Sequence, residues 1–125
     1  MNDGVDCEYA VEGHGPAIIF VHGIGASRSA WDAIIPYLRE QYTCVSYDLR
    51  GHGASPVPPP PYTLDQMVSD LSRLQTKLNV ERAHVIGHSL GGMIGPAYAR
   101  RWPDRVRTLG LLSTCLLYTS PSPRD

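Results

Sequence analysis

Apolar residues along the chain follow two spacings that alternate. Short, nearly continuous apolar runs at residues 17–21, 43–47, 83–86 and 106–112 are typical of strands that a sheet buries on both faces. Between these runs, apolar residues recur every three or four positions, as they do along one face of an amphipathic helix. This alternation predicts the fold class, an α/β protein with a mostly parallel sheet and helices on both of its faces.

Two of the helical patterns lie in the second half of the chain. The more regular one follows Thr63, which together with Gln66 fits a capping box, and its apolar face continues to about Asn79. The other covers residues 90–102 and begins with glycines. Pro96 lies about two turns into that segment, where it removes a backbone hydrogen bond, so we expect the helix to bend there.

The first half holds a third helical pattern and two other segments. A helix is predicted from about Ser29, which is placed to cap it, with an apolar face formed by Trp31, Ile34, Ile35 and Leu38. Residues 7–13 predict a short N-terminal strand. Five prolines within residues 56–61 predict an extended, exposed loop.

Composition and charge narrow the function classes. The chain has 125 residues, 42% hydrophobic and 18% charged, which suits one globular domain with a core and excludes disorder throughout. Its net charge of −1 comes from scattered residues without a basic cluster, so we expect no nucleic-acid partner. No apolar run approaches the roughly 20 residues that span a bilayer, and the N-terminus lacks a secretory signal pattern. We therefore expect a cytoplasmic protein without a membrane partner.

The cysteines suggest no special site. Cys7, Cys44 and Cys115 have neither the close pairing of a metal site nor the density of a disulfide scaffold. We expect no bound metal and no cofactor, and the sequence leaves the oligomeric state open.

Candidate chemistry lies where the third buried run meets the following helix. Residues 87–91 read Gly-His-Ser-Leu-Gly and match G-x-S-x-G in the strand-to-helix context that gives this motif meaning. A tight turn there places Ser89 in a strained backbone conformation, and Gly87 and Gly91 are small enough to avoid collisions. The turn would raise the Ser89 hydroxyl above the sheet edge and direct the N–H groups at the helix start toward an oxyanion.

A second Gly-rich segment follows the first buried run. Residues 22–25 read His-Gly-Ile-Gly, and their backbone can face the same point as the serine turn. We expect the N–H groups of Ile24 and Leu90 to form an oxyanion hole, supported by His22 and Gly23. Each such donor is worth roughly 3 kcal/mol in the transition state.

These motifs identify a family resemblance. HGIGAS, DLRGHGAS and GHSLGGMIG occur in the order found in α/β-hydrolases, and residues 5–114 resemble the N-terminal half of the esterase, lactonase and peroxidase-like group. The run from DLRGHGAS to GHSLGGMIG is especially similar to 3-oxoadipate enol-lactonase-like members. The resemblance implies that Ser89 is a nucleophile that attacks a small ester or lactone and forms an acyl-enzyme, which water releases. Dehalogenases and epoxide hydrolases of this fold carry aspartate there, so the serine favours acyl chemistry.

None of the five histidines is a good candidate for the general base. His22 and His52 are expected to hold loop backbone, and His88 lies next to the nucleophile, where it could line the pocket but points away from the serine. In the family, the acid and the histidine of the triad follow later in the chain. We expect both to be absent here and the fragment to be nearly inactive, and we expect Asp104 to start the last strand.

Three further expectations complete the sequence-based account. Residues 1–114 are expected to form a truncated hydrolase domain, and residues 115–125 (CLLYTSPSPRD) resemble the translation of a transposase sequencing adapter, with a ragged native C-terminus as the alternative. Residues 106–112 would become an exposed apolar edge that promotes aggregation.

Alternative functions are a non-catalytic binding or receptor protein, and perhydrolase or C–C hydrolase activity on the same triad.

Overall fold

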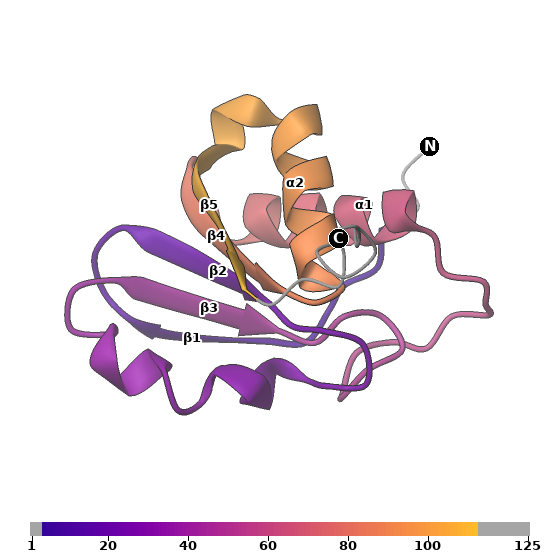
Figure 1. Ribbon diagram of the computed structural model, residues 1–125, viewed down its shortest axis with the longest axis horizontal. Coiled ribbons are helices and arrows are strands. Elements are labelled where there is room, and N and C mark those ends of the chain that lie inside the picture. The colour runs from indigo at the N-terminus through magenta and orange to yellow at the C-terminus, as the bar shows by residue number, and fades with distance from the viewer. Residues whose placement is uncertain (1–3, 113–125) are drawn as a thin grey trace, which may run out of the picture.

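The computed structural model describes residues 4–112, which form one five-stranded sheet with helices on both sides (Figure 1). The expected tail at residues 115–125 lies outside the described residues. The strands are β1 (Tyr9–Gly13), β2 (Ala17–Val21), β3 (Thr43–Tyr47), β4 (Ala83–His88) and β5 (Val106–Leu112). The α-helices are α1 (Leu64–Lys77) and α2 (Gly91–Arg101), and the short 3₁₀ helices are η1 (Arg28–Trp31), η2 (Ile35–Tyr37) and η3 (Pro103–Arg105).

Strand order and direction confirm the predicted fold class. The order across the sheet is β1-β3-β2-β4-β5, and β3, β2, β4 and β5 are parallel while β1 pairs antiparallel with β3. Because β2, β3 and β4 are parallel neighbours, the loops that follow them meet at one edge of the sheet. The Gly-rich segment and the serine turn therefore come together at that edge.

The core has two parts, one on each face of the sheet. α1 and α2 cover one face, where side chains of the strands pack against Val68, Leu71, Ile94 and Tyr98. η1 and η2 cover the other face, where Trp31 packs on Phe20 at a centroid distance of 5.0 Å. All five residues of β2 are buried, as expected for a strand covered on both faces.

The predicted helix from Ser29 to Leu38 is wrong. The structure has two separate 3₁₀ turns there, and Ser27, not Ser29, caps the first by accepting a hydrogen bond from the Ser29 N–H. Pro36 lacks the N–H that a continuous helix would need, so the segment breaks before it. Trp31 and Ile35 still pack on the sheet, but Ile34 is 39% exposed and does not join the apolar face.

The other two predicted helices are confirmed. α1 begins with the complete capping box of Thr63 and Gln66, in which each side chain binds the other residue's backbone N–H. α2 runs from Gly91 to Arg101 with Pro96 inside it. The proline-rich segment 56–61 is irregular and mostly exposed, as predicted. Within residues 4–112, no helix is long and apolar enough to cross a membrane.

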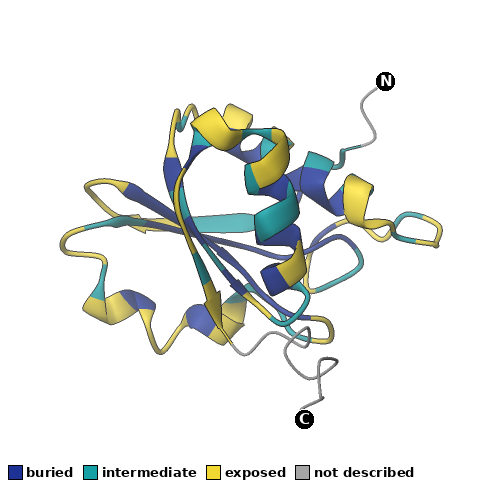
Figure 2. Cartoon of the chain, turned by 45° about the horizontal axis from the view of Figure 1, so that its top comes forward, coloured by how far each residue is buried: buried dark blue, intermediate teal, exposed yellow. Residues whose placement is uncertain are grey.

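β5 lies at the edge of the sheet, and most of its residues are exposed (Figure 2). Leu109, Leu111 and Leu112 are all at least a third exposed. An edge strand presents unpaired backbone groups that a second chain can bind, and apolar side chains strengthen that contact. We therefore expect the 125-residue chain to self-associate in size-exclusion chromatography with light scattering.

A matched pair of variants tests this expectation. Leu111→Lys places a charge on the edge strand and should shift the population toward monomer. Val57→Lys changes a side chain that is more exposed but lies in the proline-rich loop, and it should leave association unchanged. A sharp monomer peak for the unmodified chain, with cooperative unfolding, would contradict the expectation.

Candidate active site

Ser89 lies in the turn that joins β4 to α2 and has a backbone conformation that side chains rarely adopt. Its φ is 58°, in the left-handed region, and its side chain is half-buried. Among the described residues other than glycine, Asn79 is the only other one with positive φ. Asparagine tolerates this region well, whereas serine is less common there. Strained residues held by their surroundings cluster at functional sites, so this conformation marks the turn as a candidate.

The glycines on either side of Ser89 are required by close backbone contacts. A methyl group on Gly87 would collide with the backbone of Gly91, across the turn. A methyl group on Gly91 would collide with the carbonyl of Val21, at the end of β2. The start of α2 thus packs directly against β2, and neither position has space for a larger residue.

The Gly-rich loop, residues 22–25, lies directly against Ser89. A methyl group placed on Gly23 would be 2.8 Å from the Ser89 Cβ and 3.3 Å from its Oγ. The next residue, Ile24, is 73% exposed. The structure therefore brings together the two segments that the sequence proposed as halves of one site.

The hydrogen bonds of α2 begin at the serine turn. The N–H of Gly92 donates to the Ser89 carbonyl, and the N–H groups of Met93 and Ile94 donate to the Leu90 carbonyl. Leu90 precedes these residues, at the helix end where N–H groups have no intrahelical acceptor. The same end carries the positive part of the helix dipole, which favours negative charge close to Ser89.

His22 holds the Gly-rich loop from inside the protein. Its ring is buried; Nδ1 lies 2.6 Å from the Gly23 carbonyl oxygen, and Nε2 accepts the Leu49 N–H at 3.0 Å. Because Nε2 accepts, the ring is neutral and Nδ1 is the donor. The carbonyl of Gly23 and the N–H of Ile24 belong to one trans peptide plane and point in opposite directions. By fixing the carbonyl, His22 sets the direction of the Ile24 N–H.

Burial of His22 makes the stability of the protein depend on pH. Removal from water lowers the pKa of His22 below its usual value of 6.5, and a repulsive contribution from His52 acts in the same direction. The unfolded chain then binds a proton that the folded chain does not, so stability is complete above pH 6.5 and is lost as the pH falls below it. We expect the urea midpoint to fall between pH 7 and pH 5.

The contribution of His22 can be isolated by substitution. His22→Asn should reduce the slope of the urea midpoint against pH, whatever it does to the midpoint at neutral pH. His14→Asn changes an exposed histidine and should leave the slope as in the unmodified chain. An unchanged slope in His22→Asn would show that another group causes the acid sensitivity.

A second segment, the Asp48 loop (residues 48–55), follows β3 and holds both the start of η1 and the Gly-rich loop. The carboxylate of Asp48 accepts the Arg28 N–H at 2.7 Å and a guanidinium hydrogen bond from Arg28 at 2.8 Å, and it also accepts the Ala54 N–H. Nε2 of His52 accepts the Gly25 N–H at 3.0 Å. Sequence reasoning assigned His52 to loop support, but it missed Asp48 and Arg28, because they are 20 residues apart and only the fold brings them together.

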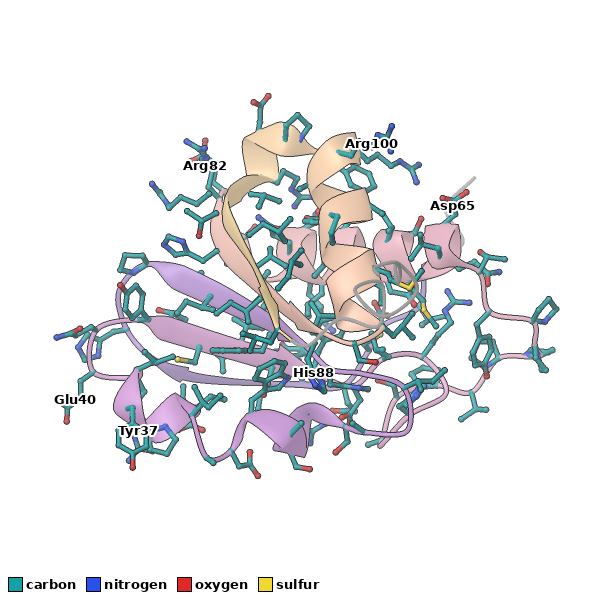
Figure 3. The ribbon with its side chains drawn as sticks, in the orientation of Figure 1. Tyr37, Glu40, Asp65, Arg82, His88 and Arg100 are labelled. Carbon is teal, nitrogen blue, oxygen red and sulfur yellow. The ribbon has the colours of Figure 1, made fainter. Side chains whose placement is uncertain are left out.

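The side chains of the remaining histidines and of Asp104 take no part in the hydrogen bonds described above for the Gly-rich loop. His88 ends β4 and its side chain is exposed; Figure 3 places it at the loop end of the sheet, beside the start of α2. His84 meets the Thr108 hydroxyl, on β5. The prediction that Asp104 starts the last strand is wrong: Asp104 is exposed in η3, and β5 begins at Val106. Within residues 4–112, no three His, Cys, Asp or Glu side chains are grouped so that they could hold a metal ion.

Comparisons with a family model, with solved structures and with curated proteins all point to one family. The family model described as the alpha/beta hydrolase fold matches residues 16–125. A solved hydrolase from Pseudomonas aeruginosa is 40% identical with a TM-score of 0.86, and the match covers 91% of this chain and 44% of that one. The 3-oxoadipate enol-lactonase 2 of Acinetobacter baylyi is 36% identical over 99 residues, or 79% of this chain and 37% of that protein.

Relatives with a different chemistry are equally similar. A fluoroacetate dehalogenase from a Burkholderia species is 38% identical over 113 residues, covering 86% of this chain and 37% of that protein. The chain spans only about a third of the length of the curated relatives, between 30% and 39% of each. The match to the family model covers most of the sequence, and the strand order, the serine turn and the Gly-rich loop agree with it; the chain therefore belongs to the alpha/beta hydrolase family.

Proposed function

We propose that this chain is the N-terminal part of a serine hydrolase that cleaves a small carboxylic ester or lactone, with Ser89 as the nucleophile. The observation that carries the proposal is the left-handed backbone of Ser89, held directly against Gly23 of the Gly-rich loop. The enol-lactonase relative supports the substrate class. The dehalogenase relative shows that the family includes other chemistry, and the serine at position 89 favours acyl transfer over it.

The proposed reaction follows from the positions of these groups. Ser89 Oγ attacks the carbonyl carbon, loses its proton to a base and forms a tetrahedral intermediate whose oxygen carries the negative charge. The N–H groups of Ile24 and Leu90 stabilise that oxygen. Collapse of the intermediate expels the alcohol and leaves an acyl-enzyme, and a water molecule then releases the acid and restores the hydroxyl.

The base and its acidic partner are proposed to belong to a part of the enzyme that this sequence does not contain. His22 and His52 have both ring nitrogens in contact with backbone groups, so neither is placed to take the serine proton. The short coverage of the relatives supports this proposal. Oxyanion stabilisation and binding without the triad leave roughly 10³-fold catalysis over water in a comparable enzyme. We expect a residual activity of that kind here.

Hydrolysis of p-nitrophenyl acetate by the purified chain tests the proposal. Ser89→Ala should remove only the part of the turnover that passes through an acyl group on Ser89, and the part due to oxyanion stabilisation and binding should remain. Ser69→Ala changes a serine on the outer surface of α1 and should keep both parts. Equal and full esterase turnover in the unmodified chain and in Ser89→Ala would refute the role of Ser89.

The C-terminal residues 115–125 are proposed to be non-native, as their similarity to an adapter translation suggests. Resequencing the locus tests this independently of the enzyme proposal. A longer reading frame with different codons after Thr114 would support it, and recovery of the same eleven residues from genomic DNA would refute it.

A further inference from the structure

His52 holds the exposed end of the Gly-rich loop through a single hydrogen bond. Its Nε2 accepts the Gly25 N–H at 3.0 Å, and its Nδ1 lies 2.9 Å from the Arg50 carbonyl oxygen. A ring that accepts at Nε2 and donates at Nδ1 is a neutral imidazole with one defined tautomer. The hydrogen bond between His52 and Gly25 therefore depends on the protonation state of His52.

We propose that His52 is a positioning residue for the oxyanion site, and that its protonation releases the Gly-rich loop. The inference rests on the proposed function, because the position of the Ile24 N–H matters only if that group binds an oxyanion. A protonated imidazole has an N–H on both nitrogens. The Gly25 N–H would then face another donor, and the hydrogen bond that joins Gly25 to the Asp48 loop would be lost, while that of His22 with the Leu49 N–H would remain.

The two peptide planes beside Ile24 are held by different histidines. The plane of Gly23 and Ile24 is fixed at the Gly23 carbonyl, which meets His22 and accepts the Ala26 N–H at 3.2 Å. The plane of Ile24 and Gly25 is fixed at the Gly25 N–H by His52. Release of the second plane leaves Ile24 supported on one side, so the direction of its N–H becomes less well defined.

The end of the loop has space to move once it is released. Gly25 has a φ of +78°, and the space beside its Cα, where a side chain would begin, contains no other atom within 4 Å. Ile24 itself is mostly exposed to solvent. A conformation that needs glycine and has no packing around it depends on its hydrogen bonds. The Gly25 N–H bond to His52 joins this end of the loop to the Asp48 loop.

The charged groups around His52 are already engaged with partners. The ring of His22, from the β2 side, is 5.2 Å away between centroids. Asp48, on the same loop as His52, is paired with Arg28 of η1 at 2.8 Å. Arg50, whose carbonyl meets His52, has its guanidinium on Asp70 of α1. Protonation of His52 therefore adds a charge to a region whose other charges are balanced.

Nuclear magnetic resonance of the labelled chain tests the proposal directly, in a Leu111→Lys background that limits association. We expect the Gly25 amide shift and the His52 ring proton shift to change with the same midpoint as the pH is lowered. His52→Gln offers an uncharged acceptor at a similar position, so the Gly25 amide should become insensitive to pH. His52→Ala removes the acceptor, and exchange of the Gly25 amide with solvent should become about tenfold faster.

Controls separate this effect from general loss of structure. His14→Gln should leave the Gly25 titration unchanged, and the Leu49 amide, which binds His22, should stay protected in every variant. A Gly25 amide that does not titrate, or that titrates equally in His52→Gln, would overturn the proposal. Ser89→Ala should not affect the titration, so failure of the proposed nucleophile and failure of the His52 role give different results.

A functional readout follows from the same variants. Labelling of Ser89 by a fluorophosphonate should decline more steeply with acid in the unmodified chain than in His52→Gln, because the latter keeps the loop in place. If His52 had a purely structural role, His52→Gln would lower the labelling of Ser89 at all pH values, and the dependence of labelling on pH would keep its shape. Identical profiles in the two chains would contradict the release of the loop by protonation.

Discussion

Asp70→Asn is expected to destabilise the protein by about 3–5 kcal/mol, because it leaves a buried arginine without its counter-charge. The carboxylate of Asp70 accepts two hydrogen bonds from the Arg50 guanidinium, at 2.7 and 2.9 Å, and one from the Val5 N–H. The two side chains are 3% and 2% exposed. A domain of this size has a stability of roughly 5–15 kcal/mol, so the loss is a large part of the total.

Urea unfolding measures this loss of stability, and two other variants are compared with Asp70→Asn. Asp6→Asn breaks the exposed pair with Arg73 and should change the midpoint little, because solvent screens that pair. The double variant Arg50→Met with Asp70→Leu replaces both charges with apolar groups and should recover most of the stability. If Asp70→Asn unfolds at the same urea concentration as Asp6→Asn, the buried pair does not have the assigned role.

Gly91→Ala is expected to disrupt the strand-to-helix turn, although alanine is the better helix former by about 1 kcal/mol. Its methyl group would collide with the Val21 carbonyl and lie 2.7 Å from the carbonyl carbon, and the rigid backbone of β2 cannot move aside. Inserting a methyl group into a fully packed site costs typically 1–3 kcal/mol, and we expect at least the upper end here.

The matched control for this variant lies one turn further along the same helix. At Gly95 the nearest atom to an added methyl group is the end of the Leu109 side chain, at 2.9 Å, which can rotate away. Gly95→Ala should therefore be neutral or slightly stabilising in the same urea experiment. Equal stability of the Gly91→Ala and Gly95→Ala chains would show that the close approach of α2 to β2 is not required.

The elements of this fold were predictable where local pattern and tertiary packing agree. The capping box at Thr63 and the buried run of β2 each need only neighbouring residues to be recognised, and the structure has both. The segment from Ser29 to Leu38 failed because apolar spacing suggested one helix, while Pro36 and the cap at Ser27 divide it into two short turns. Backbone hydrogen bonding prevailed over side-chain periodicity there.

The candidate site was predictable in its parts but not in the contacts that support it. The order of strand, Gly-rich loop and serine turn follows from the motifs, and parallel strands bring the two loops to one edge. The contact of Asp48 with Arg28, and that of His52 with Gly25, join loops whose relative position depends on the whole sheet. Sequence spacing holds no information about that position, so these contacts appear only in the structure.

The most direct test of the account is to react the purified chain with a fluorophosphonate and locate the adduct by peptide mass spectrometry. Attack by Ser89 Oγ on phosphorus expels fluoride, the Oγ proton passes to solvent, and a stable phosphonyl group remains that the N–H groups of Ile24 and Leu90 would hold. Because the proposed base lies outside this sequence, we expect an adduct that forms slowly and only on Ser89, and none in Ser89→Ala. A chain that stays unmodified at Ser89, or that is modified equally in Ser89→Ala, would contradict the claim that this hydroxyl is a nucleophile facing an oxyanion site.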